Sequence, residues 1–456
     1  MSESTTAAPP RLRRGLKVLG ALLITLSAIT PASSVFIIAP GVIGQAGTGA
    51  IWSFLAAGVV GVFMAFVYAE LASAYPLTGG EYAIVGRTLG RLPGFLVMGL
   101  IMVTQVIIIA VIALGVGIYL SAVFPALNGP VVAAVTVVAA AVFGVLDIRV
   151  NAWVTGIFLA IEIMALVIVS ALGLLNVERP LFAEPVAGSP PAAVTIGVIG
   201  AATAVAIFAY NGYGSAVMLG EETTDASRGI ARAILWALVI TVIAEIVPVT
   251  AVLLGAPALD GLFGAGNMME YFITSRAGSG WNTAISLAIA VAIINAVLAI
   301  LLLTARLFFS SARDSVWPGR VNRGLGAIHP RFHTPWVATL AVGVLSAAVC
   351  FVDLDVLLVV TGSSLIVVYA ALCLAVLAGR RNGTTAHARY RMRWFPVPPV
   401  LALAALGYVT YQTARDPVIG RPSLLVTLGI LVVSAVCYLL RRKHWVLRDP
   451  ADDQAD

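Results

Sequence analysis

The sequence predicts an all-α membrane protein with about twelve transmembrane helices. Of its 456 residues, 60% are hydrophobic and only 11% are charged, whereas soluble globular chains carry about 25% charged residues. The apolar residues form long runs between short polar breaks, and a bilayer core about 30 Å thick needs roughly 20 apolar residues for one helical span. These runs are apolar all round, which favours helices over the alternating segments of a membrane β-barrel.

The predicted spans follow one another along a single domain, residues 16–441, between a tail at 1–15 and another at 442–456. We place them at 16–44, 49–74, 93–120, 129–146, 152–175, 193–219, 230–256, 282–304, 335–352, 356–379, 396–414 and 423–440. Each span is an apolar run bounded by polar residues, so membrane lipid is expected to surround most of the chain.

The formal net charge of +6 could indicate a nucleic-acid partner, so the positions of the basic residues matter. With the N-terminus inside, 23 of the 27 Lys and Arg residues fall on the cytoplasmic side and 4 fall outside. This asymmetry follows the positive-inside rule, which predicts a cell-membrane protein with both termini cytoplasmic and no nucleic-acid partner. The basic N-terminus resembles a secretory signal, but the apolar run resumes at Val35 and we expect no cleavage.

The residues that membrane enzymes need are missing from the predicted spans. All four histidines lie in predicted loops or the tail, and the only lysines are Lys17 and Lys443. The spans therefore offer no Schiff-base lysine and no phosphate-binding loop. The three cysteines lie in apolar runs, as small buried hydrophobic residues do. We expect no enzyme activity, no cofactor and no metal site.

Two predicted spans are interrupted by residues that break helices. In the first, Pro31 removes a backbone donor, and Ser33 and Ser34 can cap a restarted helix. In the sixth, Asn211 and Gly212 interrupt an apolar run. Irregular backbone at membrane depth is tolerated chiefly where it lines a cavity. Alternatively, Pro31 only kinks its span and the glycine only allows close packing.

The two breaks lie in spans of opposite direction, five helices apart in order. This pattern is typical of a five-plus-five inverted repeat, here 16–175 and 193–379 followed by two peripheral helices at 396–440, with a solute between the discontinuous helices. A restarted helix offers N–H groups to an anion and the terminated half offers carbonyls to a cation, so a zwitterionic amino acid fits both. The residues expected around the solute are Ser33, Ser34, Phe208, Ala209, Tyr210, Asn211 and Gly212.

Four stretches of the sequence carry a family resemblance. They are SAITPASSVF at 27–36, YAELASAYPLTGGEY at 68–82, FAYNGYGSAVMLGEETTDASRGIARAI at 208–234, and TARLFFSSARDSVWPG at 304–319 with IHPRFHTPWVA at 328–338. Together they resemble the amino acid–polyamine–organocation superfamily of permeases over nearly the whole chain. The resemblance implies the fold of the bacterial leucine transporter, with ten core helices and two peripheral ones, and transport by alternating access.

Thr30, directly before Pro31, is also expected in the solute site, and the resemblance adds Ala32. The resemblance implies that backbone around Ala32, Ser33 and Ser34 meets the solute carboxylate, while carbonyls near Phe208 and Ala209 meet its amine.

This chain departs from the family pattern at three places. The segment from Pro31 to Ser34 replaces a glycine-rich break, so the carboxylate pocket would have a different shape. Gly214 stands where some arginine and polyamine exchangers carry a glutamate, which argues against a polycationic solute. Phe158 or Leu159 stands where some proton-coupled members carry a lysine, which excludes lysine-based coupling at that place.

Ionisable groups at membrane depth are functional candidates, because burying them costs several kcal/mol. Glu162, midway along the fifth span, is the coupling candidate: it could bind and release a proton, or be a structural acid. Glu245 lies in the seventh span, which is more often scaffold, and Glu70 is expected to anchor a loop by pairing with Arg87 or Arg91. The residues that could line the cavity, or equally bond neighbouring helices, are Gln105, Tyr213 and Asn295.

The expected function is secondary active transport of amino acids across the cytoplasmic membrane, by proton or cation coupling or by exchange. The partners are therefore a small solute, either an amino acid or a related amine, and a coupling proton or cation. A permease or exchanger of amines or polyamines is the alternative transporter, and a transporter-like sensor or a membrane enzyme is the alternative from another class.

Overall fold

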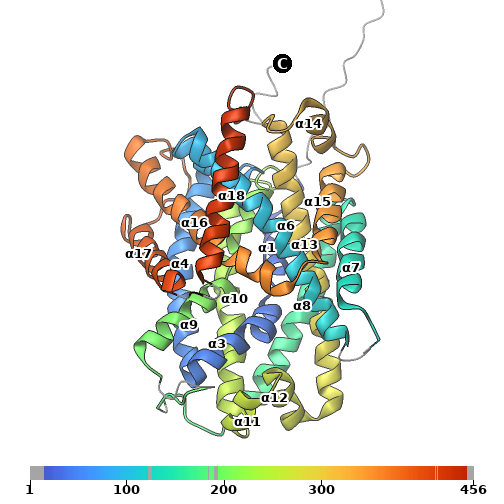
Figure 1. Ribbon diagram of the computed structural model, residues 1–456, viewed down its shortest axis with the longest axis vertical. Helices are drawn as coiled ribbons and strands as arrows, with labels where there is room; N and C mark the ends of the chain where they lie inside the picture. Colours follow the sequence, from blue (N-terminus) through green and yellow to red (C-terminus); the bar gives the residue numbers. More distant parts are fainter. Residues whose placement is uncertain are drawn as a thin grey trace, which may run out of the picture.

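The computed structural model describes residues 15–121, 126–182, 184–188, 194–415, 417 and 420–448. Within these residues all regular structure is helical, apart from one isolated bridge between Leu16 and Thr223. The all-α prediction is therefore confirmed for the described chain. The long helices run along the vertical axis of Figure 1, with α14 and the end of α18 at the top and α11 and α12 at the bottom. Most of both predicted tails lies outside the described residues.

Ten predicted spans correspond to continuous helices. These are α4 (Ala50–Ala74), α6 (Arg91–Ser121), α7 (Gly129–Gly144), α8 (Ile148–Leu174), α10 (Ala226–Gly255), α13 (Ser279–Arg313), α15 (Trp336–Val349), α16 (Leu354–Asn382), α17 (Val397–Arg415) and α18 (Gly420–Arg441).

The first and sixth predicted spans are divided, as their helix-breaking residues indicate. The first consists of α1 (Val18–Ile29), α2 (Pro31–Ser33), the π-helix η1 (Ser34–Ile38) and α3 (Ala39–Ala46), and the 3₁₀ turn η2 (Gly47–Gly49) then leads into α4. The sixth consists of α9 (Ile196–Ala209) and the 3₁₀ helix η3 (Tyr213–Leu219), and its predicted first residue, 193, lies outside the described residues.

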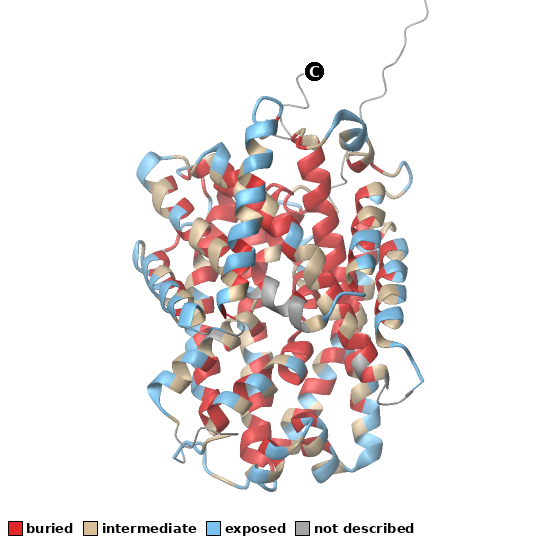
Figure 2. Cartoon of the chain, viewed as in Figure 1, coloured by how far each residue is buried: buried red, intermediate tan, exposed pale blue. Residues whose placement is uncertain are grey.

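The chain is a multi-pass membrane protein. Eight described segments are long and apolar enough to cross a membrane, and the first of them, Val18–Ala74, contains the first two predicted spans. Two shorter helices, α7 and α15, are also apolar. Figure 2 shows the exposed residues on the outer helices and the buried ones in the centre. Exposed apolar side chains such as Val135 and Leu440 face outward, as lipid contact requires.

Four short helices occupy regions that the sequence analysis left as loops. They are α5 (Gly80–Thr88), α11 (Leu259–Gly264), α12 (Met268–Ala277) and α14 (Gly319–Leu325). In α5 every residue except Arg87 is buried, because the helix packs against α4, α6 and α16. Helices of this length are too short to be recognised as membrane spans, so only their tertiary contacts reveal them.

α13 lies at the centre of the bundle. Nearly all of its residues from Ile289 to Ala312 are buried, and it contacts α1, α6, α7, α8 and α15. This central helix therefore connects the first broken helix with the outer ones.

The expected pairing of Glu70 with Arg87 or Arg91 is wrong. The buried Glu70 carboxylate accepts two hydrogen bonds from Arg380 of α16, each 2.6 Å long, and one from the Met392 N–H at 2.8 Å. Arg91 instead donates to the Arg442 carbonyl, 3.0 Å away. Glu70 does anchor a loop, but this loop is the one that follows α16, more than 300 residues from Glu70 in the sequence.

Candidate functional site

The first helix is broken at Thr30. This residue has left-handed backbone angles, φ 50° and ψ 72°, and it separates α1 from α2. Its N–H still donates to the Leu26 carbonyl, so α1 ends with its last hydrogen bond made. Pro31 then begins the restarted helix and has no N–H. The Ala32 N–H is therefore the first free donor after the break.

A carboxylate from another helix accepts a hydrogen bond from this N–H group. Oε1 of Glu162, on α8, accepts a hydrogen bond of 2.8 Å from the Ala32 N–H and one of 3.3 Å from the Thr30 hydroxyl. The Thr30 hydroxyl also lies 2.9 Å from that of Ser33. Glu162 is fully buried, and its Oε2 has no hydrogen-bond partner. Glu162 thus lies where the restarted helix would attract an anion.

The sixth helix is broken at Gly212. α9 ends at Ala209, the Asn211 N–H turns back to the Phe208 carbonyl at 3.1 Å, and η3 begins at Tyr213. Gly212 has φ 121°, which L side chains rarely adopt. A Cβ atom on Gly212 would lie 2.9 Å from Cγ1 of Ile29, the last residue of α1. The backbones of the two breaks are therefore in close contact.

The two broken helices lie side by side and antiparallel. α1, which precedes the first break, packs against η3, which follows the second break. Likewise α3, which follows the first break, packs against α9, which precedes the second break. The Ser34 hydroxyl donates to the Ala209 carbonyl over 2.9 Å, joining the two breaks directly. Buried backbone polar groups of both helices consequently meet at one place in the bundle.

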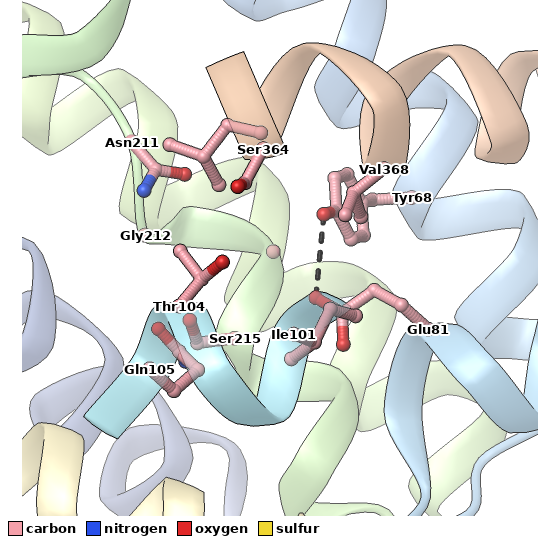
Figure 3. A pocket seen from close by; sticks show the side chains of 12 residues that line it. Tyr68, Glu81, Ile101, Thr104, Gln105, Asn211, Gly212, Ser215, Ser364 and Val368 are labelled. Atoms are coloured by element: carbon pink, nitrogen blue, oxygen red, sulfur yellow. Dashed lines mark hydrogen bonds between the residues drawn. The ribbon is translucent and has the colours of Figure 1, made fainter. Parts of the chain in front are cut away.

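A small polar cavity adjoins the break of the sixth helix (Figure 3). Its volume is about 40 Å³, enough for water molecules or a small polar group but not for a whole amino acid. It is lined by residues of α4, α5, α6, α16, η3 and the break itself. The polar ones among them are Tyr68, Glu81, Thr104, Gln105, Asn211, Ser215 and Ser364.

Glu81 is the functional candidate that sequence reasoning missed. It lies in the first turn of α5 with only 6% of its surface exposed, and its Oε1 accepts a 3.3 Å hydrogen bond from the Tyr68 hydroxyl (Figure 3). Burial raises the pKa of the Glu81 carboxyl to about 7, although its own N–H and the Tyr68 hydroxyl act in the opposite direction. The sequence does contain a signal that could have identified Glu81: it is an acidic residue directly after two glycines in the stretch 68–82.

The remaining predicted residues fall into two groups. Gln105 and Asn211 line the cavity, and the Asn211 side chain accepts a 2.6 Å hydrogen bond from Tyr369 of α16. Tyr213 packs edge-on against Tyr68, with ring centres 6.0 Å apart, beside the cavity.

Two other predicted residues form hydrogen bonds to neighbouring helices. The Tyr210 hydroxyl donates to the Phe54 carbonyl at 3.1 Å. The Asn295 amide donates to the Ser27 hydroxyl at 2.9 Å and to the Thr155 carbonyl at 3.2 Å. These bonds join α13, α1 and α8 on the α1 side of the break, so Asn295 has the helix-bonding role that the sequence analysis left open.

A second buried acid lies beside the first break. Glu245 of α10 is fully buried, and neither carboxyl oxygen has a hydrogen-bond partner among the described residues. It lies next to the Ser34 hydroxyl and within electrostatic range of Glu162. Two carboxyl groups from α8 and α10 therefore flank the same restarted helix, with no basic side chain paired to either among the described residues.

Known proteins match this chain along most of its length. The model of a family described as amino acid permease matches residues 16–437. An uncharacterized transporter of Mycobacterium tuberculosis is 33% identical over 75% of this chain and 74% of its own. The methylthioribose transporter of Bacillus subtilis is 26% identical over 88% of each chain, and the branched-chain amino acid permease of the same organism is 24% identical over 97% of this chain and 96% of its own.

Proposed function

The chain belongs to the amino acid permease family, and from this premise we propose that it carries amino acids across the cell membrane by alternating access. One observation carries the proposal: two antiparallel broken helices meet at their breaks, where the Ser34 hydroxyl reaches the Ala209 carbonyl. Broken helices of this kind expose backbone donors and acceptors at membrane depth, where a solute can use them.

Helix packing supports an inverted repeat as the basis of this transport. If the first five spans and the next five are related by a two-fold axis in the membrane plane, helices near the axis should pack against their counterparts. The counterparts do pack in pairs: α4 with α10, α6 with α13, and α7 with α15. The proposed movement is a rocking or gating of one helix group against the rest, around the two breaks.

The proposed solute contacts use both breaks. The solute carboxylate binds the N–H groups around Ala32, Ser33 and Ser34, and the amine binds carbonyls at Phe208 and Ala209. The names of the relatives include a branched-chain amino acid permease and a methylthioribose transporter, so amino acids are the first class to test. The alternative is a permease of amines without a carboxylate. It gains support because the Ala32 N–H already donates a hydrogen bond to Glu162 and is not free for a solute carboxylate.

We place proton coupling at Glu162. Its carboxylate and that of the solute need the same N–H group, so binding of one displaces the other. A displaced, buried carboxylate without a partner is costly, and taking up a proton removes that cost. Solute binding would thereby draw a proton onto Glu162.

Uptake by proteoliposomes tests the proposal. Vesicles containing the purified protein receive a panel of radiolabelled amino acids, amines and methylthioribose, with and without an imposed pH gradient. We expect concentrative uptake of at least one amino acid in response to the gradient. Uptake of amines alone would favour the alternative, and no uptake of any solute would contradict transport.

The variant Glu162→Gln mimics the protonated acid and should lose gradient-driven accumulation while it keeps solute exchange. Glu184→Gln is the matched control, because it makes the same change in an exposed loop residue that lies away from both breaks. It should keep the response to the gradient. If Glu162→Gln still concentrates solute, Glu162 is only a structural acid.

A further inference from the structure

Several buried or half-buried acids among the described residues have an arginine partner. Near the end of the bundle where α13 ends, Glu222 pairs with Arg306, Glu221 pairs with Arg313 at 2.7 Å, and Glu70 pairs with Arg380. Glu81 has no such partner: its Oε2 is buried and accepts no hydrogen bond from any described residue. A buried carboxylate without a counter-charge is unstable unless it is protonated or a cation binds to it.

The cavity beside the break supplies the space for a cation. No Lys, Arg or His is among the residues that line it. Instead, oxygen atoms surround the space: the Glu81 carboxylate at one end, the Asn211 and Gln105 amides at the other, and hydroxyls between them (Figure 3). An ammonium group carries three N–H donors and needs such acceptors. Its size is close to that of a water molecule, which suits a cavity of about 40 Å³.

We propose that this cavity binds a primary ammonium group of the transported solute, with Glu81 as its counter-charge. The proposal rests on the proposed function, and it deepens that function by naming a solute class. The α-amine of an amino acid is assigned to carbonyls at Phe208 and Ala209, whereas the cavity begins at Asn211 and extends away from them to α5. The ammonium bound there is therefore a second one, at the end of an amino acid side chain.

Protonation of Glu81 would oppose this binding. The groups that face Glu81 are the Tyr68 phenol from α4, the Tyr369 phenol from α16, and the uncharged Thr104 and Gln105 from α6. On the side of η3, the Tyr213 phenol packs against Tyr68. Because phenols stay neutral near pH 7, Glu81 alone changes its charge there. Its pKa of about 7 predicts that ammonium binding weakens as the pH falls from 8 to 6.

A thermal-shift experiment on the purified full-length protein in detergent measures this site without requiring transport. The probe is methylammonium chloride, which fits the cavity, compared at equal concentration with tetramethylammonium chloride, which has the same charge but no N–H donor. We expect methylammonium to raise the melting temperature at pH 8, less so at pH 6, and tetramethylammonium to leave it unchanged. Equal shifts from both salts, or a larger shift from sodium chloride, would overturn the ammonium assignment.

The variant Glu81→Gln should abolish the methylammonium shift without lowering the melting temperature of the ligand-free protein, because an amide removes an uncompensated buried charge. The control Glu184→Gln makes the same change in an exposed loop residue and should keep the shift. A shift that persists in Glu81→Gln would contradict the site.

Paired solutes then connect the site with transport. Lysine and norleucine both carry the α-amino and carboxyl groups, but only lysine has a second ammonium group. Glu81→Gln should weaken lysine binding about tenfold or more and leave norleucine binding unchanged. Equal losses for both solutes would refute the assignment. Absence of amino acid uptake would refute the proposed function, while the methylammonium shift would still decide whether the ammonium site exists.

Discussion

At the scale of single residues, the broken helices depend on two unusual backbone conformations. Thr30 and Gly212 both have positive φ, and they lie against each other through Ile29. The sequence indicated both positions, because Pro31 and Gly212 are strong helix breakers. It could not indicate that Glu162, 130 residues from Ala32, would satisfy the donor at the break. Such a contact depends on how α8 packs against α2, which no local pattern encodes.

Gly212→Ala should both destabilise the protein and weaken solute binding. The new Cβ would lie 2.9 Å from Ile29 Cγ1 and 3.1 Å from its Cα, so the two breaks must move apart. An L residue at this positive φ adds strain of about 1–3 kcal/mol. We expect a lower melting temperature and loss of solute binding, measured on purified protein by thermal unfolding and by a radioligand assay.

Gly278→Ala is the matched control for this change. Gly278 also has a positive φ, 85°, but a Cβ there would meet nothing within 4 Å. The variant should therefore lose stability through backbone strain alone and bind solute as the wild type does. If Gly212→Ala binds solute normally, the break of the sixth helix is not part of the solute site.

At the scale of helices and their connections, arginine–glutamate pairs hold the end of the bundle near α14. Arg306 of α13 donates to both carboxylate oxygens of Glu222, which follows η3, and the bond from its Nη2 is 2.9 Å long. The Glu222 carbonyl in turn accepts the N–H groups of Gly15 and Leu16 at 2.9 Å. This buried pair thus joins the central helix, the sixth span and the segment before α1. The stretches 208–234 and 304–319 contain the two partners, but sequence alone does not pair them.

Breaking this buried pair should destabilise the protein far more than breaking an exposed one. Arg306→Met leaves the Glu222 carboxylate buried without a counter-charge, at a cost of about 3–5 kcal/mol. The comparison variant is Arg389→Met, because Arg389 and Asp225 form a 3.2 Å pair whose side chains are 56% and 55% exposed. Loss of this exposed pair should lower the free energy of unfolding by about 1 kcal/mol at most.

Thermal unfolding of the purified variants measures both effects. The double variant Arg306→Met with Glu222→Gln should recover part of the stability, since no unpaired charge remains. Equal destabilisation by the Arg306 and Arg389 variants would show that burial does not decide the strength of these pairs.

At the scale of the whole molecule, the sequence predicted the long helices well and the short ones not at all. Bilayer thickness fixes the length of an apolar span, so α4, α6, α8, α10 and α13 could be placed from composition alone. In contrast, α5 and its Glu81 were not predicted. A helix of 9 residues is too short to be recognised by the length of an apolar span, and α5 is stabilised by packing against its neighbours. The full cavity therefore could not be predicted from the sequence, although two of its predicted residues, Gln105 and Gly212, do line it.

The orientation of the chain in the membrane is the last prediction, and the ends of α4 provide its structural argument. Thr48, just before α4, donates its N–H to the Val186 carbonyl at 3.1 Å. Tyr75, just after α4, donates its hydroxyl to the Thr384 carbonyl at 2.7 Å. The 25 residues of α4 span about 37 Å, which exceeds the thickness of a bilayer core. The loop around Glu184 and the loop around Gly383 must therefore lie on opposite sides of the membrane.

Reporter fusions measure this directly. A fusion after Gly383 should show cytoplasmic reporter activity, because the loop after α16 is rich in arginine, and a fusion after Glu184 should show external activity. A third fusion after Asn267 is the control and should match the one after Glu184, since Arg276 in the following helix α12 pairs with Glu178 at 2.5 Å. The same compartment for Glu184 and Gly383 would contradict α4 as a membrane-spanning helix, and reversed compartments would contradict the cytoplasmic placement of the termini.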